Sequence, residues 1–228
     1  MSLSDKSRNA MDRDETRLRI SREAARLFLE RGVAETGGDA IAAAAAVSTR
    51  TVWRHFRNKE SCIEPVLVTS IQRFARIMDE WPLDVSLEDH LRIAMPVGGE
   101  SPRLIADGTL AVKLVALCAQ EPDIRAIWLD AYHLLEVRFH AVIARRSNRS
   151  TLDFDVRMCA ATIVAAIRII DQAISIAAVS GGQSYAAVEL AELMSGAIRK
   201  AATLPVCDPV PRAIFRFAAG DRAGADRA

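Results

Sequence analysis

A short two-faced segment, residues 47–59 with the sequence VSTRTVWRHFRNK, constrains this chain more than any other feature. Val52 and Phe56 are four residues apart, so they share one face of a helix, and Val47 precedes them as a third apolar anchor. Ser48 stands where the N-terminal cap of such a helix belongs. We therefore expect one face to be buried and the opposite face to be open to a partner.

The open face carries groups suited to nucleic acid. Four cations occur with no acid between them, and a Trp and a His are interleaved with them: Arg50, Arg54, Arg57, Lys59, Trp53 and His55. A basic surface with aromatic groups fits a phosphate backbone with base edges beside it. The alternative is a solvated basic helix without a partner, so the neighbouring segments must decide.

Two further helices are expected immediately upstream. Apolar residues recur at helical spacing from Ile20 to Phe28, and Gly32 is a stop signal, so a first helix is predicted over about 13–31. The Ala-rich residues 39–45 predict a second, short helix. Two short helices joined by a tight turn form a helix-turn-helix motif, whose second member enters the major groove of DNA.

The run from Ile20 through AARLFLERG and DAIAAAAAVSTRTVWRHFRNKES resembles the N-terminal domain of the TetR (tetracycline repressor) family of transcription regulators. Its motif positions are held by Val47, Ser48, Thr51, Phe56, Lys59 and Glu60. The resemblance implies that Trp53, His55 and Lys59 meet the DNA backbone. At least one of Arg50 and Arg54 is expected to read bases, because an Arg can donate two hydrogen bonds to guanine. The predicted DNA-binding set is Ser48, Thr49, Arg50, Thr51, Trp53, Arg54, His55 and Lys59.

The chain departs from the family motif in two places. Gly37 and Gly38 stand where the family has Thr followed by a packing Val, so a side-chain cap and a core contact are lost and the second helix is expected to fray. Ala46 stands where the turn between the two helices usually has Gly. A left-handed conformation would cost this residue roughly 1 to 2 kcal/mol.

Composition bounds the remaining possibilities. The chain has 228 residues, 50% of them hydrophobic, and a formal net charge of +1, so affinity for nucleic acid must come from a local patch. Four widely spaced cysteines, Cys62, Cys118, Cys159 and Cys207, predict reduced thiols rather than disulfides or a zinc site. The first residues are polar and lack a secretory signal core, so we expect a cytoplasmic protein with a flexible N-terminal arm.

Helical periodicity continues through the rest of the chain, with no strand pattern. Helices are expected over about 59–80, 86–95, 103–119, 122–148, 153–179 and 184–203. Pro65 lies too deep in the first of these to be tolerated and should kink it. Residues 153–179 are apolar on nearly all faces, but charged and polar side chains interrupt every window of about 18 residues, so no membrane span is expected. One face is then free for a second copy of the chain.

These patterns predict an all-α fold: an N-terminal three-helix helix-turn-helix domain and a larger C-terminal helical bundle that dimerises through a four-helix contact. We expect residues 13–62 to bind DNA and residues 63–204 to bind a ligand and dimerise. Pro, Gly, Arg and Asp dominate residues 205–228, which predicts a loosely ordered tail.

Five residues combine bulky apolar surface with a few polar tips, as a small-molecule cavity between helices requires: Trp81, Cys118, Trp128, Tyr132 and His133. Plain core packing is the alternative. His133, Glu136 and His140 share a helix face, but their spacing fits no metal-binding motif, so we expect neither a metal nor a cofactor.

The sequence therefore predicts a homodimeric regulator, and not an enzyme. It would repress transcription from a palindromic operator in double-stranded DNA and be released by a small hydrophobic or amphipathic effector. The alternative is an all-helical enzyme or metal-binding protein without DNA binding. A second cluster of His and carboxylate residues would mark that class, and the sequence shows none.

Overall fold

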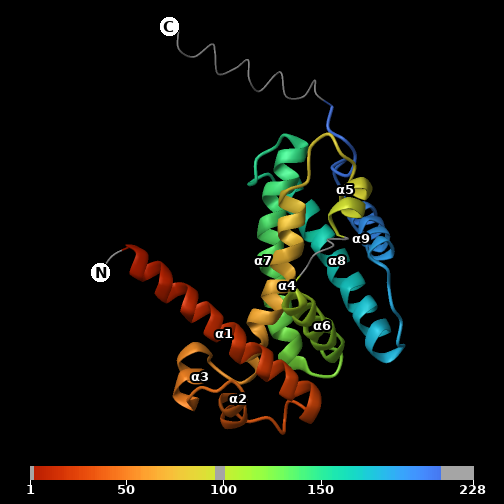
Figure 1. Cartoon of the computed structure of the whole chain (residues 1–228). Helices are drawn as coiled ribbons and strands as arrows, with labels where there is room; N and C mark the ends of the chain where they lie inside the picture. Colours follow the sequence, from red (N-terminus) through yellow and green to blue (C-terminus); the bar gives the residue numbers. More distant parts are fainter. Residues whose placement is uncertain (1–2, 96–100, 212–228) are drawn as a thin grey trace. The chain divides into compact units, whose positions relative to one another are not determined.

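The computed structural model describes residues 3–95 and 101–211, with side chains from residue 11 onward. Regular structure within these residues is entirely helical, which confirms the all-α prediction (Figure 1). The elements are α1 (Leu3–Arg31), α2 (Gly38–Ala44), α3 (Thr49–His55), the 3-10 helix η1 (Glu60–Ile63), α4 (Glu64–Asp79), α5 (Leu87–Ala94), α6 (Pro102–Leu117), α7 (Pro122–Ser147), α8 (Phe154–Ser180) and α9 (Ala187–Ala201).

The chain divides into two compact units. Unit 1 comprises Met1–Arg73, Gly99–His133 and Asp171–Ser184, and unit 2 comprises Phe74–Gly98, Leu134–Ile170 and Tyr185–Ala228. Three of the boundaries between the units fall inside α4, α7 and α8, and α1 packs on α6 within unit 1. The division into DNA-binding, ligand-binding and tail segments concerns function and stays a prediction.

Helix α1 is longer than predicted. It begins at Leu3 rather than near Arg13, so the expected flexible arm is helical from Leu3. Its end agrees with the prediction: Gly32 has φ +88° and its N–H donates to the Phe28 carbonyl at 3.0 Å. A left-handed Gly after the last turn closes a helix in this way.

Helices α2 and α3 form the predicted helix-turn-helix beside α1 (Figure 1). Ser48 caps α3, since its hydroxyl accepts a hydrogen bond from the Thr51 N–H at 3.1 Å. Val52 and Phe56 are buried, whereas Val47 is half-buried. The predicted division of this segment into a packed face and an open face is therefore confirmed.

The turn between α2 and α3 contains a strained alanine. Ala46 has φ +51°, and the N–H groups of Ala46 and Val47 donate to the carbonyls of Ala43 at 3.2 Å and Ala42 at 3.0 Å. This pair of hydrogen bonds is the Schellman ending of a helix, in which the left-handed position usually holds Gly. Having Ala here costs roughly 1 to 2 kcal/mol.

Pro65 does not kink a helix, contrary to our prediction. Residues Glu60–Ile63 form η1 and α4 begins at Glu64, so Pro65 lies in the first turn of α4, where no intrahelical N–H bond is needed. The next N–H, that of Val66, donates to the Ser21 hydroxyl of α1 at 3.1 Å. The start of α4 is thereby fixed to α1.

Residues 205–211 are held firmly in unit 2, although a loose tail was predicted. The buried guanidinium of Arg146 donates to the carbonyls of Val206 at 2.6 Å and Asp208 at 2.8 Å, and it lies 3.5 Å from the centroid of the Trp81 ring. Composition gave no sign of this docking, because it uses main-chain carbonyls. Residues 212–228 lie outside the described part of the chain.

Helices α8 and α9 leave apolar side chains uncovered in the single chain. Those in unit 2 are Phe154, Met158 and Ile169 on α8, and Val188 and Leu193 on α9. Helix α9 begins at Ala187 instead of Ser184. At this start, the Glu189 carboxylate accepts a hydrogen bond from the Ala186 N–H at 2.6 Å. Among the described helices, α8 alone is long and apolar enough to cross a membrane, a test that core helices of soluble proteins also pass.

The four cysteines are free and buried. Burial raises the pKa of the Cys62 thiol and of the Cys118 thiol to about 12, and that of the Cys207 thiol to about 11. Thiols with such pKa values are almost entirely protonated near neutral pH, so they are poor nucleophiles and poor metal ligands.

Candidate nucleic-acid interface and cavity

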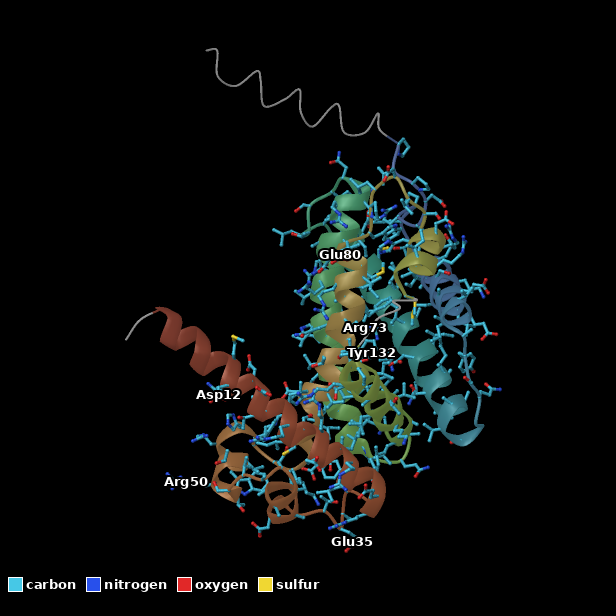
Figure 2. The ribbon with its side chains drawn as sticks, viewed as in Figure 1. Asp12, Glu35, Arg50, Arg73, Glu80 and Tyr132 are labelled. Carbon is cyan, nitrogen blue, oxygen red and sulfur yellow. The ribbon has the colours of Figure 1, made fainter. Side chains whose placement is uncertain are left out.

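The outward face of α3 is basic and exposed. Arg50, Arg54 and Arg57 are exposed, and Arg50 lies at the outer margin of the helix-turn-helix (Figure 2). The Thr49 hydroxyl donates to the Asp39 carboxylate at 2.7 Å, which ties the start of α3 to α2. The helix is therefore held by its first turn while its arginines stay free for a partner.

The remaining predicted DNA-binding residues differ in exposure and in how many of their polar groups already form hydrogen bonds within the chain. The hydroxyls of Ser48 and Thr51 lie 2.8 Å apart and bond to each other, while Trp53 is 44% exposed. The ammonium of Lys59 donates to the carbonyls of Val33 at 2.6 Å and Ala34 at 3.2 Å. An ammonium has three donors, so Lys59 joins η1 to the segment after α1 with two of its N–H groups and has a third available.

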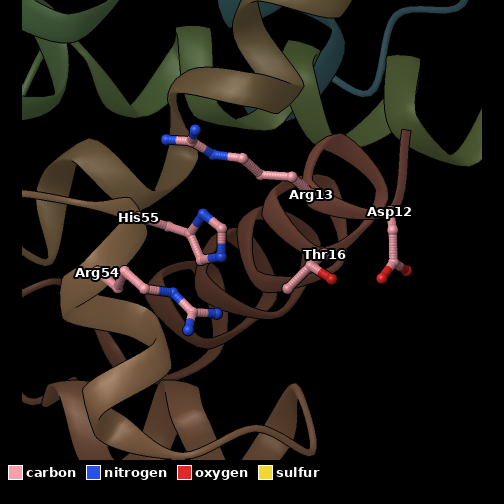
Figure 3. Close-up of a pocket in the computed structure, with 5 residues that line it drawn as sticks. All are labelled: Asp12, Arg13, Thr16, Arg54 and His55. Atoms are coloured by element: carbon pink, nitrogen blue, oxygen red, sulfur yellow. The ribbon is translucent and has the colours of Figure 1, made fainter. Parts of the chain in front are cut away.

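A groove of about 400 Å³ lies between α1 and the C-terminal end of α3 (Figure 3). Its lining residues are Asp12, Arg13, Thr16, Arg54 and His55. Burial lowers the pKa of His55, and so do the positive charges of Arg54, Arg13 and Arg17. A site where several guanidinium groups disfavour a proton is a site that favours an anion.

Arg13 is missing from the predicted DNA-binding set. Our sequence interpretation placed it at the very start of the first helix, next to a supposed flexible arm. The extension of α1 to Leu3 instead sets Arg13 on a formed helix, and its side chain reaches toward His55 (Figure 3). Its charge was the available signal, but no local pattern shows which helix it faces.

A small cavity, which we call the Trp128 cavity, lies in unit 1. Residues of α4, α6, α7 and α8 line it: Leu67, Ser70, Ile71, Ala111, Val112, Val115, Trp128 and Asp171. Its volume is about 30 Å³. Since a water molecule needs about 10 to 15 Å³ of such space, the cavity has room for about two water molecules and is nearly closed.

Asp171 is the charged residue of this otherwise mostly apolar lining. Its carboxylate accepts a hydrogen bond from the Tyr132 hydroxyl at 2.8 Å. Burial raises the pKa of Asp171, although hydrogen bonds from Tyr132 and Trp128 oppose the rise. The sequence signal for this residue was an acid within the apolar stretch 153–179, which we did not connect with a ligand.

The structure gathers three of the five predicted ligand-binding residues around Asp171. Trp128 lines the cavity, Tyr132 bonds to the carboxylate, and the charge of Asp171 contributes to the raised pKa of Cys118. The rings of Trp128 and Tyr132 meet edge to face, with centroids 5.2 Å apart. The ligand interpretation and the core interpretation therefore do not exclude each other, because Trp128 and Tyr132 are buried in the core and also lie at the cavity.

The other two predicted ligand-binding residues have different surroundings. His133 is exposed. Trp81 belongs to unit 2, where its indole N–H donates to the Val85 carbonyl at 3.0 Å and its ring stacks on His90. We therefore do not include Trp81 and His133 in the cavity. Within the described residues, no three His, Cys, Asp or Glu side chains are grouped as a metal site requires.

An ion pair joins α1 to α6, the helix that supplies one wall of the cavity. The Nε and Nη2 atoms of Arg22 donate to the two carboxylate oxygens of Asp107 at 2.6 and 2.7 Å. The two side chains are 17% and 7% exposed. Helix α6 also carries Val112 and Val115 into the cavity lining, so displacement of this helix by a ligand would act directly on α1.

Comparisons with known proteins agree with this geometry. Residues 20–66 match the model of the bacterial regulatory proteins, tetR family. The HTH-type transcriptional regulator TcmR of Streptomyces glaucescens is 28% identical over 167 residues, which cover 70% of this chain and 71% of TcmR. Salmonella enterica GusR shares the fold with a TM-score of 0.51 and 23% identity, covering 81% of this chain and 96% of GusR. The multidrug binding protein EbrR, complexed with imidazole, has a TM-score of 0.50 and 18% identity, covering 85% and 94%.

The fold and the exposed basic face of α3 define a helix-turn-helix, DNA-binding regulator of transcription. The match over residues 20–66 and the similarity to TcmR narrow this class. Residues 20–66 therefore match the N-terminal domain of the tetR family of bacterial regulatory proteins, as the sequence motif predicted.

Proposed function

We propose that this regulator is a homodimeric repressor that binds a palindromic operator and leaves it when a small effector enters the Trp128 cavity. The exposed basic face of α3, on a helix whose opposite side is buried, carries the proposal. In a dimer, two copies of α3 would enter successive major grooves about 34 to 36 Å apart. Bound operator would then exclude the transcription machinery.

We assign different roles to the residues of this face. Arg50 and Arg54 are exposed one turn apart and would read base edges. Trp53, His55 and Lys59 would contact the backbone, which fixes register but carries no sequence information. Ser48, Thr49 and Thr51 complete the proposed contact set from the first turn of α3.

The dimer is supported by the uncovered apolar residues of α8 and α9. Phe154, Met158 and Ile169 fall on one face of α8, because spacings of 4 and 15 residues return to within about 60° on a helix. Arg157 and Arg168 interrupt α8, which favours a protein partner over a membrane. A second copy would bury both helices in a four-helix contact.

Leu193→Glu tests the dimer. Leu193 is 39% exposed on α9, so the substitution should spare the fold, dissociate the dimer and weaken operator binding by about a hundredfold. Leu152→Glu is the matched control, because Leu152 is 84% exposed in the α7–α8 loop. Ile198 on the same helix is buried, so a substitution there would report on folding instead. A Leu193→Glu protein that remains a dimer in sedimentation would refute this interface.

Effector binding is proposed at the Trp128 cavity. EbrR, which shares the fold, is a multidrug binding protein and has been solved with imidazole. Because the cavity holds about two water molecules when empty, an effector must widen it and would select a different arrangement of α6. Asp171 favours a small, partly apolar effector with a hydrogen-bond donor or a positive charge.

Selection from a random duplex library tests the whole assignment. The enriched duplex should be palindromic, and its affinity should fall steeply with salt, because each neutralised phosphate releases counterions. Failure to bind any duplex at low salt would favour the all-helical enzyme or metal-binding alternative. We further propose that the protein acts in the cytoplasm without a cofactor or enzymatic activity, because its family consists of transcription regulators.

A further inference from the structure

Gly38, the first residue of α2, faces the ring of Trp53 on α3. A Cβ atom added to Gly38 would lie 2.1 Å from Cζ2 of Trp53, 2.8 Å from Cη2 and 3.0 Å from Cε2. Carbon atoms that are not bonded pack at about 3.5 to 4.0 Å, so the indole occupies the space that any other side chain at position 38 would need.

The neighbouring glycine is different. Gly37 has nothing within 4 Å of its Cβ position, and its φ of −97° and ψ of 162° are extended backbone that other residues adopt. It caps α2 without a side-chain hydrogen bond, so nothing in its surroundings requires Gly. Of the two glycines that depart from the family motif, only Gly38 lies so close to another side chain, that of Trp53, that a Cβ atom would clash with it.

We propose that Gly38 is a positioning residue for DNA binding, because its missing side chain seats the indole of Trp53 against α2. The seat fixes the direction from which Trp53 meets the DNA backbone. This inference rests on the proposed function of α3.

The geometry supports a functional seat rather than simple core packing. Trp53 is 44% exposed, so one part of its ring rests on α2 while another part stays open to a partner. The two other tryptophans, Trp81 and Trp128, are 3% and 1% exposed. A large ring with two side-chain torsions, held on one side, meets a sugar–phosphate surface with little loss of conformational freedom.

Gly38→Ala separates positioning from folding. Ala favours a helix more than Gly does, and the atoms that must give way are the outer atoms of the exposed Trp53 ring. The melting temperature should therefore stay the same or rise. Affinity for the duplex recovered by selection should nevertheless fall, by roughly tenfold.

Gly37→Ala is the matched control, since it makes the same change one residue earlier in open space. Its operator affinity should stay within about twofold of the wild type. Equal losses in Gly37→Ala and Gly38→Ala would show that the glycines act only through the backbone of α2, and would overturn the inference.

A double-mutant cycle of Trp53→Phe and Gly38→Ala tests whether Gly38 acts through the Trp53 ring. Phe lacks the outer ring atoms that approach Gly38, so adding Gly38→Ala should have little further effect on operator affinity in the Trp53→Phe background. A loss as large as that in the Trp background would refute the seat. Unchanged affinity in Gly38→Ala alone would refute it as well.

Acrylamide quenching of tryptophan fluorescence reads the seat without DNA. Trp53 is the exposed tryptophan of the three, so quenching reports mainly on its ring. Gly38→Ala should increase the quenching, whereas Gly37→Ala should not; no increase would overturn the inference. If the wild type binds no duplex at all, the proposed function fails, and this measurement still decides whether Gly38 seats Trp53.

Discussion

The α3 face and the Trp128 cavity, both in unit 1, place charge in opposite surroundings. On α3, Arg50 and Arg54 stay exposed, so their charges remain hydrated and act over the distance that salt permits. In the cavity, Asp171 lies in a mostly apolar lining, and burial raises its pKa. DNA binding should therefore depend strongly on salt and effector binding only weakly. Ionic strength then becomes a means of separating the two activities.

The largest expected effect is on specific DNA binding. Arg54→Ala should weaken binding to the selected duplex by about 1 to 3 kcal/mol for each half-site, because a base contact is lost. Binding to random DNA should weaken much less. Arg57→Ala is the control, since it removes an exposed charge that we assign to no base and should weaken both duplexes alike. Titrations over a salt series would measure this. Equal losses on both duplexes in Arg54→Ala would reduce α3 to a basic patch.

The next effect concerns the connection between the two regions. Arg22→Ala leaves Asp107 with a partly buried, unpaired charge and should lower the free energy of unfolding by about 3 kcal/mol. Arg26→Ala on the same helix breaks ion pairs of an exposed guanidinium that water screens, so it should lower the free energy of unfolding far less. Urea unfolding of both variants tests the contrast, which similar losses would contradict.

Asp171→Asn is expected to have a smaller effect, visible through pH. The folded pKa of Asp171 lies above its ordinary value of 3.8, so the folded protein holds this proton more tightly than the unfolded chain. Wild-type stability is therefore lost as pH rises through the folded pKa, whereas Asn has no proton to lose. The melting temperature of the variant should equal that of the wild type near pH 3.5 and should be about 2 to 4 °C higher at pH 7.5.

Asp130→Asn, an exposed acid on α7, is the control for that comparison and should show no such divergence. Operator affinity of Asp171→Asn should be unchanged at every salt concentration, because the residue belongs to the cavity. A melting difference that is constant with pH would show that Asp171 is not destabilised by burial.

The smallest effect should come from His55. Burial and nearby arginines lower its pKa in the free protein, and a phosphate in the α1–α3 groove would offset those charges and raise it again. The complex then binds the proton more tightly, so operator affinity should rise about threefold as pH falls from 8 to 6. His55→Gln should remove this dependence. If the dependence survives in that variant, the groove does not hold a phosphate beside His55.

The two regions also differ in how far the sequence revealed them. The two faces of α3 follow from a contiguous stretch, because the spacing of Val52 and Phe56 and the cap at Ser48 are local signals. The start of α1 was misplaced, since polar residues such as those before Arg13 suit an arm and an exposed helix equally well.

The cavity depends on four helices, and no single segment encodes it. Trp81 and Trp128 looked alike in the sequence as bulky aromatic residues, and their surroundings alone distinguish them. Gly38 appeared as a defect for the same reason. Its partner, Trp53, is fifteen positions away on another helix, and the spacing between the two helices is a tertiary property.

The buried cysteines leave the surface free for chemistry of the experimenter's choosing. With every native thiol shielded from solvent and three of them held protonated, a maleimide dye should react far faster with a cysteine introduced at Leu152 than with any native one. The single exchange Leu152→Cys would place one fluorophore on each chain and leave all four native cysteines in place. In the proposed dimer, energy transfer between the two dyes would then follow assembly, operator capture and release in real time.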